Sequence, residues 1–462
     1  MQGLGRLVVR GGAVMAVRQI IGMGLSVAGL LVVARLIGPQ AYGTYASAFA
    51  IQFVVQLLCQ GGVDVYLMRR DADPTRSELN QAFTLLLTVG LLVALIGWPA
   101  SYLVDAWVGV PMIGEVLSTM LWAMPIALVS LVPSAILQRR MAFVPVAWVE
   151  LAGQAALYAV AIPMAMTRHG VWAPAAGFWA QQVVTSVLMF IRAKYRPSLR
   201  LDILEAKEML SFGIGYAFSV WSWQARLLVN PLIVARYLGA ESAGAVALSI
   251  RIADTLCMLR PVAWRLAIAG LARVKAEPER MRHGAGDGMR VLMLTTGPAL
   301  VFFAFVAPWV VPFAFGADWA PVAMIFPFVA LSYLVNCVFT MHSAVLYVLG
   351  RTREVTLFHL TSLMLFAISA MAFVPAFGLV GYGYAEIVAM AAYGVSELFV
   401  RRQVGSPGTG LGLIWAAGFG LALFAPVFGP LAWLGPVVVV ILPETRQTVA
   451  RYWSMVKEAA HA

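Results

Sequence analysis

Long apolar stretches follow one another along almost the whole chain, separated by short polar connections. Fourteen can be drawn, at residues 11–37, 42–67, 79–104, 112–138, 143–166, 171–193, 209–238, 243–267, 289–315, 320–348, 354–375, 378–400, 410–427 and 429–443. A helix needs about twenty apolar residues to cross the hydrocarbon of a bilayer. Most of the stretches reach that length, and the last is the shortest. The pattern predicts an all-α polytopic membrane protein with about 14 transmembrane helices.

Basic residues occur in every second connection and are nearly absent from the others. The basic connections hold Arg6 and Arg10; Arg69, Arg70 and Arg76; Arg139 and Arg140; the cluster from Arg192 to Lys207; the cluster from Arg273 to Arg290; Arg351 and Arg353; Arg401 and Arg402; and Arg446, Arg451 and Lys457. By the positive-inside rule these connections are cytoplasmic. Both termini are then cytoplasmic, and the first stretch is a retained helix, since no small-residue cleavage site follows it. We expect a multi-pass membrane protein.

Composition narrows the class of protein further. The chain is 61% hydrophobic and only 11% charged, with a mean hydropathy of +0.86. Its net charge of +11 comes from the basic connections, which orient the chain in the membrane and attract anionic lipids. We therefore expect no nucleic-acid partner. The three cysteines lack metal-ligand spacing, and no catalytic or phosphate-loop motif is present. The sequence therefore predicts neither an enzyme nor a metal or cofactor site, and favours a carrier.

The chain contains an internal repeat. Residues 33–51 and 234–252 align without a gap at an offset of 201, and seven of the nineteen positions are identical, among them Arg35/Arg236, Gly38/Gly239 and Gly43/Gly244. Each copy ends one apolar stretch, turns at glycine and starts the next. Duplicated halves are typical of secondary transporters, whose substrate site lies between the repeats. We expect six-helix lobes at 1–200 and 201–403, then two extra helices and a cytoplasmic tail at 404–462.

Ionisable residues inside the predicted helices indicate the site, because each is costly in a bilayer unless it is paired or hydrated. The candidate cavity residues are Arg18, Arg226, Arg251, Asp254 and Arg265. In a continuous eighth helix, Arg251, Asp254 and Arg265 share one face, and Arg251 and Asp254 are spaced to pair. Arg260 projects from the opposite side and is interpreted as an inner-end residue. An arginine-lined cavity suits phosphate oxygens, whereas the alternative is an internal arginine–aspartate lock between helices.

Carboxylates at depth are candidates for ion coupling or ion pairing. Asp64, Glu150 and Glu386 lie well inside predicted helices. They could couple transport to a proton or sodium gradient, and we expect no other cofactor or ion. Asp64 is also placed to pair with Arg18 or with the arginines that follow it. Glu397, beside Arg401, is interpreted as a bridge or an interfacial residue. His342 and His359 are interpreted as hydrogen-bonded structural residues.

Several strings together resemble the oligosaccharide flippases of the multidrug/oligosaccharidyl-lipid/polysaccharide exporter superfamily. They are ARLIGPQAYGTYA, QGGVDVYLMRR, AILQRRMAF, RHGVWAPAAGFWAQQ, LSFGIGYAFS, ARYLGAESAG, GADWAPVAMIFPFVALS and FGLVGYGYAE. The resemblance spans residues 5 to 400. It implies two pseudo-symmetric lobes, a central cavity, and flipping of undecaprenyl-pyrophosphate-linked oligosaccharide across the bacterial inner membrane by alternating access. It also implies that Arg18 lines the cavity, and it makes polysaccharide polymerase machinery a further candidate partner.

The resemblance leaves rival functions. One is a lipid II flippase, whose loss would be lethal. Another is a multidrug or organic-cation antiporter of the same superfamily, which would favour a carboxylate-led cavity. In the flippase reading Arg226 and Arg251 hold the pyrophosphate, Asp254 orients Arg251, and Arg18 captures the head group.

Overall fold

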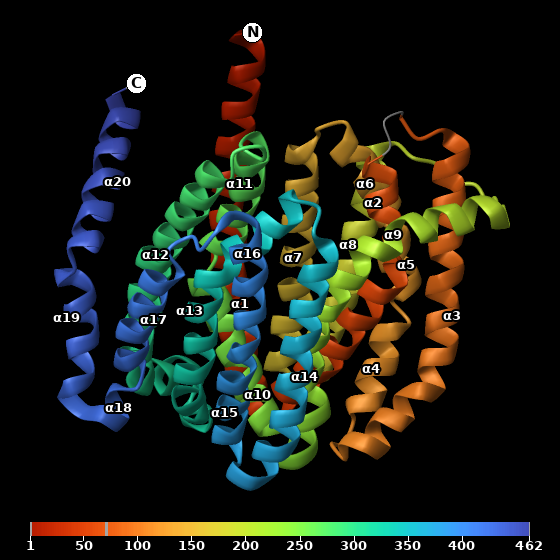
Figure 1. Ribbon diagram of the computed structural model, residues 1–462. Coiled ribbons are helices and arrows are strands. Elements are labelled where there is room, and N and C mark those ends of the chain that lie inside the picture. The colour runs from red at the N-terminus through yellow and green to blue at the C-terminus, as the bar shows by residue number, and fades with distance from the viewer. Residues whose placement is uncertain (1, 70–72, 462) are drawn as a thin grey trace. The chain divides into compact units, whose positions relative to one another are not determined.

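The computed structural model describes the backbone of residues 2–69 and 73–461, and the side chains of residues 21–68, 73–211, 217–451 and 454. These residues form helices and connections without a strand (Figure 1). The chain divides into two compact units, one made of Met1–Ala247 with Ala314–Asp318 and the other of Leu248–Phe313 with Trp319–Ala462. The lobe boundaries expected at residues 200 and 403 stay a prediction.

Within the described residues, nine helices are long and apolar enough to cross a membrane, or eleven if each of two bent helix pairs counts as one span. The all-helical, multi-pass class is thereby confirmed. The predicted number of 14 is compatible with this result, because two of the nine, Ile21–Gln60 and Ala217–Leu256, each run through a glycine where the backbone leaves the helical conformation.

The first unit is built from helices of very different length. They are α1 (Gln2–Gln60), α2 (Val63–Arg69), α3 (Arg76–Val108), α4 (Ile113–Leu121), α5 (Met124–Val129), α6 (Leu131–Arg139), α7 (Phe143–Met166), α8 (Trp172–Ala193), α9 (Ile203–Gln224), the 3₁₀ turn η1 (Ala225–Leu228) and the π turn η2 (Asn230–Val234). Its core packs α3 against α4 and α5 around the fully buried Met120, Met124 and Leu128. Helix α10 (Ala235–Leu256) passes from this unit into the second.

The second unit holds the remaining elements. They are α11 (Leu259–Arg273), α12 (Pro278–Phe315), η3 (Ala317–Trp319), α13 (Pro321–Val348), α14 (Thr352–Phe377), α15 (Leu379–Ala389), η4 (Met390–Ala392), α16 (Tyr393–Val404), α17 (Thr409–Leu423), α18 (Ala425–Phe428), η5 (Gly429–Trp433), α19 (Leu434–Ile441) and α20 (Pro443–His461). The ends of α12 and η3 at Ala314–Asp318 belong to the first unit. Phe326 of α13, Phe366 of α14 and Trp415 of α17 are fully buried in its core.

The two copies of the repeat have the same backbone shape at their turns. Gly38 has φ 77° and ψ 170°, and Gly239 has φ 81° and ψ 176°. This region of φ and ψ is essentially open to glycine alone, so both turns depend on the shared residue. The sequence repeat is therefore also a structural repeat at the point where the identities are densest.

The two turns also touch each other inside the first unit. A Cβ atom on Gly43 would overlap the carbonyl oxygen of Ala240, and a Cβ atom on Gly244 would overlap the carbonyl oxygen of Pro39. Pro39 and Ala240 are equivalent positions in the two copies, as are Gly43 and Gly244. The contact is thus reciprocal, and glycine at both positions allows the two backbones to approach this closely.

Several helices predicted as continuous are broken, and two of the breaks bear on the repeat and on the site. The helix expected at 42–67 stops at Gln60 and restarts as α2 after Gly61 and Gly62, both in the left-handed region. The helix expected at 243–267 is interrupted at Cys257 and Met258, between α10 and α11. The second break rearranges the predicted site, as described below.

The connection between α8 and α9 is fastened to α3 by side-chain hydrogen bonds. Burial raises the pKa of Tyr195 to about 12, against a smaller lowering by Arg76. The neutral hydroxyl of Tyr195 donates to Asn80 Oδ1 at 2.8 Å. Gln81 Oε1 accepts from the backbone N–H of Asp202 at 2.7 Å, and Gln81 Nε2 donates to the carbonyl of the same residue at 2.9 Å. These bonds fix where α9 begins.

A Gln81→Ala variant is expected to loosen this connection. Removing both bonds leaves the backbone N–H of Asp202 without its partner, which costs about 1–3 kcal/mol, whereas the Asp202 carbonyl keeps its bond from the N–H of Ala206. In detergent-solubilised protein, tryptic cleavage after Arg200 should therefore become several times faster. Gln154→Ala is the matched control, because its amide bonds to Gly22, elsewhere in the unit. Equal cleavage rates in the two variants would contradict the role given to Gln81.

Candidate functional site

The break between α10 and α11 joins two charged residues of the second unit. Arg260 Nη2 lies 3.8 Å from Asp254 Oδ1. In an unbroken helix, residues six apart point about 120° away from each other, so the predicted opposite placement of Arg260 assumed continuity and is wrong. At the break the N–H of Arg260 bonds to the carbonyl of Cys257, three residues back instead of the four of an α-helix. Pro261 has no N–H to offer that carbonyl, which favours the break.

Helix α13 supplies the other side of this cluster. The Tyr333 hydroxyl donates to Asp254 Oδ1 at 2.7 Å, and its ring lies under the Arg260 guanidinium, 4.9 Å from centroid to Cζ. Arg260 Nη1 donates to Asn336 Oδ1 at 2.8 Å, and Asn336 Nδ2 donates to the Tyr393 hydroxyl at 2.7 Å. Tyr333 and Asn336 are three residues apart and so share a face of α13. We call Asp254, Arg260, Tyr333 and Asn336 the α13 cluster.

The α13 cluster is partly exposed and is not a fully buried ion pair. The side chain of Arg260 is 23% exposed and that of Asp254 is 46% exposed. The guanidinium of Arg260 is held by a carboxylate, an amide and an aromatic face, which orient it and leave donors free for an incoming acceptor. The sequence indicated Asp254 but not Arg260, Tyr333 or Asn336.

Three further arginines were predicted to line the cavity. Arg251 and Arg265 are close to the α13 cluster in sequence, and Arg226 belongs to the first unit. Arg251 of α10 is exposed, and so is Arg265 of α11. The carboxylate of Asp254 has its hydrogen bond from Tyr333 and its ion pair with Arg260, and its role in orienting Arg251 stays a prediction. Arg226 lies in the 3₁₀ turn η1, half-buried, with its guanidinium 5.4 Å from the ring centroid of Trp223.

Two predicted residues lie on α1 and α7 of the first unit. Gln154 Nε2 donates to the carbonyl of Gly22, and the Tyr158 hydroxyl donates to the carbonyl of Ser26. Both pairs are 132 residues apart. The same spacing, one helical turn earlier, places the exposed Glu150 opposite backbone position 18. The side chain of Arg18 lies outside the described residues. Asp64 is half-buried in the first turn of α2, a position that favours a negative charge.

Glu386 of α15 is buried and doubly hydrogen-bonded. Its carboxylate accepts from the Ser332 hydroxyl at 2.8 Å and from the Tyr382 hydroxyl at 3.1 Å. These bonds satisfy a carboxyl group in an otherwise apolar environment. Whether Glu386 carries a coupling proton stays a prediction.

A second polar group joins α13, α16 and α17. His342 Nε2 lies 2.7 Å from Glu397 Oε2, and the Thr409 hydroxyl donates to the same oxygen at 2.7 Å. His342 is fully buried, in agreement with its expected role as a hydrogen-bonded residue. Glu397 forms a bridge, which is one of its two expected roles, and the partner that the structure describes for its carboxylate is His342.

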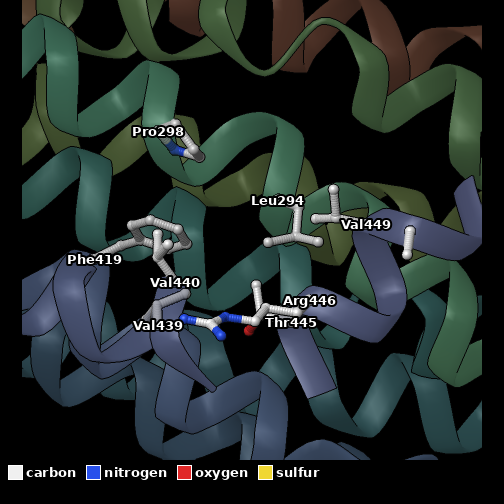
Figure 2. Close-up of a pocket in the computed structure, with 9 residues that line it drawn as sticks. Leu294, Pro298, Phe419, Val439, Val440, Thr445, Arg446 and Val449 are labelled. Carbon is white, nitrogen blue, oxygen red and sulfur yellow. The ribbon is translucent and has the colours of Figure 1, made fainter. Parts of the chain in front are cut away.

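The second unit also has an apolar groove of about 480 Å³ between α12, α17, α19 and α20 (Figure 2). Its walls include Leu294, Phe419 and Val440. Among the residues that line it, Arg446 alone is charged, and the buried hydroxyl of Thr445 has no hydrogen-bond partner in the described part of the chain. Apolar walls with one cationic group are chemically suited to amphipathic molecules such as lipids.

The chemistry available in these sites is that of binding. Among the described residues, no group of three or more histidine, cysteine, aspartate or glutamate side chains is arranged to hold a metal ion. The segment from Arg251 to Arg265 carries three arginines and one aspartate. This excess of guanidinium groups inside a membrane chain favours an anionic ligand.

The fold is that of transporters in the multidrug/oligosaccharidyl-lipid/polysaccharide exporter superfamily. The chain is similar to the structure of the lipid II flippase MurJ in an inward closed conformation, with a TM-score of 0.71, 13% identity, and 97% of this chain and 99% of the other covered. It is also similar to an inward-facing multidrug resistance MATE transporter, with a TM-score of 0.68, 15% identity, and 84% and 98% covered. At these identities the likeness establishes the fold.

The chain belongs to the polysaccharide biosynthesis protein family, whose model matches residues 32–324. It is 23% identical over 313 residues to the lipopolysaccharide biosynthesis protein WzxC of Escherichia coli (strain K12), and this alignment covers 66% of the chain and 62% of that relative. The resemblance to the flippase group seen in the sequence is thereby confirmed. The two similar structures are those of a lipid II flippase and a multidrug resistance transporter, and the prediction that this chain is not an enzyme agrees with these similarities.

Proposed function

We propose that this protein is a flippase that moves undecaprenyl-pyrophosphate-linked oligosaccharide across the bacterial inner membrane for surface polysaccharide export. Its substrate would be carried from the cytoplasmic to the external leaflet by alternating access. The lipid-linked oligosaccharide is its partner, and polysaccharide polymerase machinery and anionic membrane lipids are further candidate partners.

The observation that carries this proposal is the positive excess around α10 and α11. This stretch has three arginines and one aspartate. The α13 cluster holds the guanidinium group of Arg260 in a partly exposed position. A pyrophosphate offers several oxygens that guanidinium groups bind bidentately. A cation-exporting site would instead need a surplus of carboxylates. The family match and the name of the relative WzxC support the same class of substrate.

The residue roles follow from this reading. Arg260 joins Arg226 and Arg251 as a group that binds the pyrophosphate, and Arg265 adds positive charge at the cytoplasmic end. Arg18 captures the head group, with Glu150 as its counter-charge on the facing helix. Asp64 and Glu386 remain the candidates for coupling to a proton or sodium gradient. Both termini lie in the cytoplasm in this proposal.

Depletion of the protein tests the function. We expect surface polysaccharide to fall and the lipid-linked oligosaccharide to accumulate in the inner membrane of the same cells, because the block lies between synthesis and export. Both are measured by extraction and glycan analysis. Complementation with the wild-type chain should reverse both changes.

Two other outcomes would replace the proposal. Death of the depleted cells with accumulated lipid II would identify a peptidoglycan precursor as the substrate, as the name of the similar lipid II flippase MurJ suggests. Unchanged polysaccharide with altered tolerance to cationic drugs would identify an antiporter.

A further inference from the structure

Two equivalent arginines make equivalent contacts within the first unit. Arg35 Nη1 donates to the carbonyl of Ala314 at 3.0 Å, and Arg236 Nη1 donates to the carbonyl of Trp107. Arg35 and Arg236 are the same position in the two copies of the repeat. Trp107 is the second-last residue of α3, and Ala314 is the second-last residue of α12.

Each arginine thus caps a helix of the other repeat. Helix α3 contains the third apolar stretch of the first repeat, at 79–104, and α12 contains the third of the second, at 289–315. The last four carbonyls of a helix lack partners within it and carry the negative end of the helix dipole. A guanidinium at that end forms a charge-assisted hydrogen bond. We call these two contacts the crossed arginine caps.

The crossed caps surround the glycine contact between the two turns. Arg35 lies three residues before Gly38, and Arg236 lies three residues before Gly239. The two turns meet at Gly43 and Gly244. All of these positions lie at the ends of connections without basic clusters, the side opposite to the arginine-rich connections.

We propose that the crossed arginine caps are a latch that holds the two repeats together on the external side and that must open when the site opens outward. This inference rests on the proposed alternating access. Both arginines are exposed, so water can replace their carbonyl partners and the caps can be released reversibly. Two weak and equivalent contacts can be broken and formed again in every transport cycle.

The second cap also has aromatic contacts. The guanidinium of Arg236 lies 4.0 Å from the ring centroid of Trp107 and 5.7 Å from that of Tyr237. The Trp107 indole N–H is itself anchored to the carbonyl of Leu232 at 3.2 Å. Cation–π attraction therefore adds to the hydrogen bond at the second cap.

Spin labels on the two turns test the latch. Gln40 and Glu241 are equivalent positions, both exposed, beside the glycine contact. With the native cysteines replaced by alanine, labels at 40 and 241 report the distance between the turns in the purified protein. Removing one cap should raise the ratio of long to short distances about threefold, and removing both about tenfold. Arg35→Lys should lie between Arg35→Ala and the wild type.

The control is Arg280→Ala, which removes an exposed arginine that pairs with Glu277 and should leave the distances unchanged. Identical distance distributions in the wild type and the double variant would overturn the latch. As a second measurement, a reducible cross-link between cysteines at 40 and 241 should stop polysaccharide export until it is reduced, and export through the intact cross-link would also overturn it. The distances do not depend on the substrate, so a failed export assay with shifted distances would count against the proposed function and not against the latch.

Discussion

An Arg260→Ala variant is expected to lose most surface polysaccharide while the protein remains in the membrane. The substitution removes the guanidinium that Asp254, Asn336 and Tyr333 orient. Because Asp254 is almost half exposed, the uncompensated carboxylate is hydrated, and the loss of stability is limited to about 1–2 kcal/mol. Export, measured as surface polysaccharide per unit of membrane-inserted protein, should fall at least about tenfold, which corresponds to loss of one charge-assisted contact with the substrate.

A comparison with Asp254→Asn separates substrate binding from a structural lock. Asparagine keeps an acceptor for the Tyr333 hydroxyl and leaves the positive charge of Arg260 in place. If the arginine binds an anion, Asp254→Asn should retain much more export than Arg260→Ala. Equal loss in the two variants would show instead that the pair serves to join α10 and α11 to α13. Arg280→Ala, on the surface of the same unit, should behave as the wild type does.

A Gly43→Ala variant is expected to be strongly destabilised. The added Cβ atom overlaps the carbonyl oxygen of Ala240, and the next atoms in its way are also backbone, so no side-chain rotation can relieve the clash. Overpacking of this kind costs about 3 kcal/mol or more, which should lower the melting temperature of the purified protein by about 6 °C or more. The melting temperature is read from intrinsic tryptophan fluorescence.

Gly24→Ala is the matched control, since it lies in the same helix and its Cβ atom would meet nothing within 4 Å. Alanine there should be neutral or slightly stabilising, because it reduces the freedom of the unfolded chain. Gly244→Ala, which clashes with the carbonyl of Pro39, should resemble Gly43→Ala. A normal melting temperature in both turn variants would mean that the two backbones do not meet as described.

Much of the fold follows from patterns that the membrane imposes. Apolar stretches of the right length, alternating with basic connections, predict the spans because lipid cannot satisfy an exposed backbone. The repeat around Gly38 and Gly239 predicts two equivalent turns, and their backbone angles agree to within about 10°. These features are local in the sequence, so one sequence is enough to find them.

The composition of the site depends on contacts between distant segments and was only partly predictable. Asp254 stands out as a charge in an apolar stretch, but its partner Tyr333 is 79 residues away and looks like any aromatic residue of a membrane helix. Arg260 was misplaced because the apolar pattern continues across Cys257 and Met258. Pro261 was the available signal, since a missing N–H four residues after Cys257 weakens the helix there.

The reciprocal contact at Gly43 and Gly244 has the form of an isologous interface, in which each partner presents the same residues to the other. In a symmetric dimer of half-length chains, the same glycine and the same arginine would occur once in each chain and form both sides of the contact. A substitution would then change both sides together. Joining the halves in one chain removes that constraint. The equivalent of Arg18 is Ser219, and the equivalent of Asp64 is Arg265. Thus the two halves have kept one geometry where they meet and acquired different charges elsewhere.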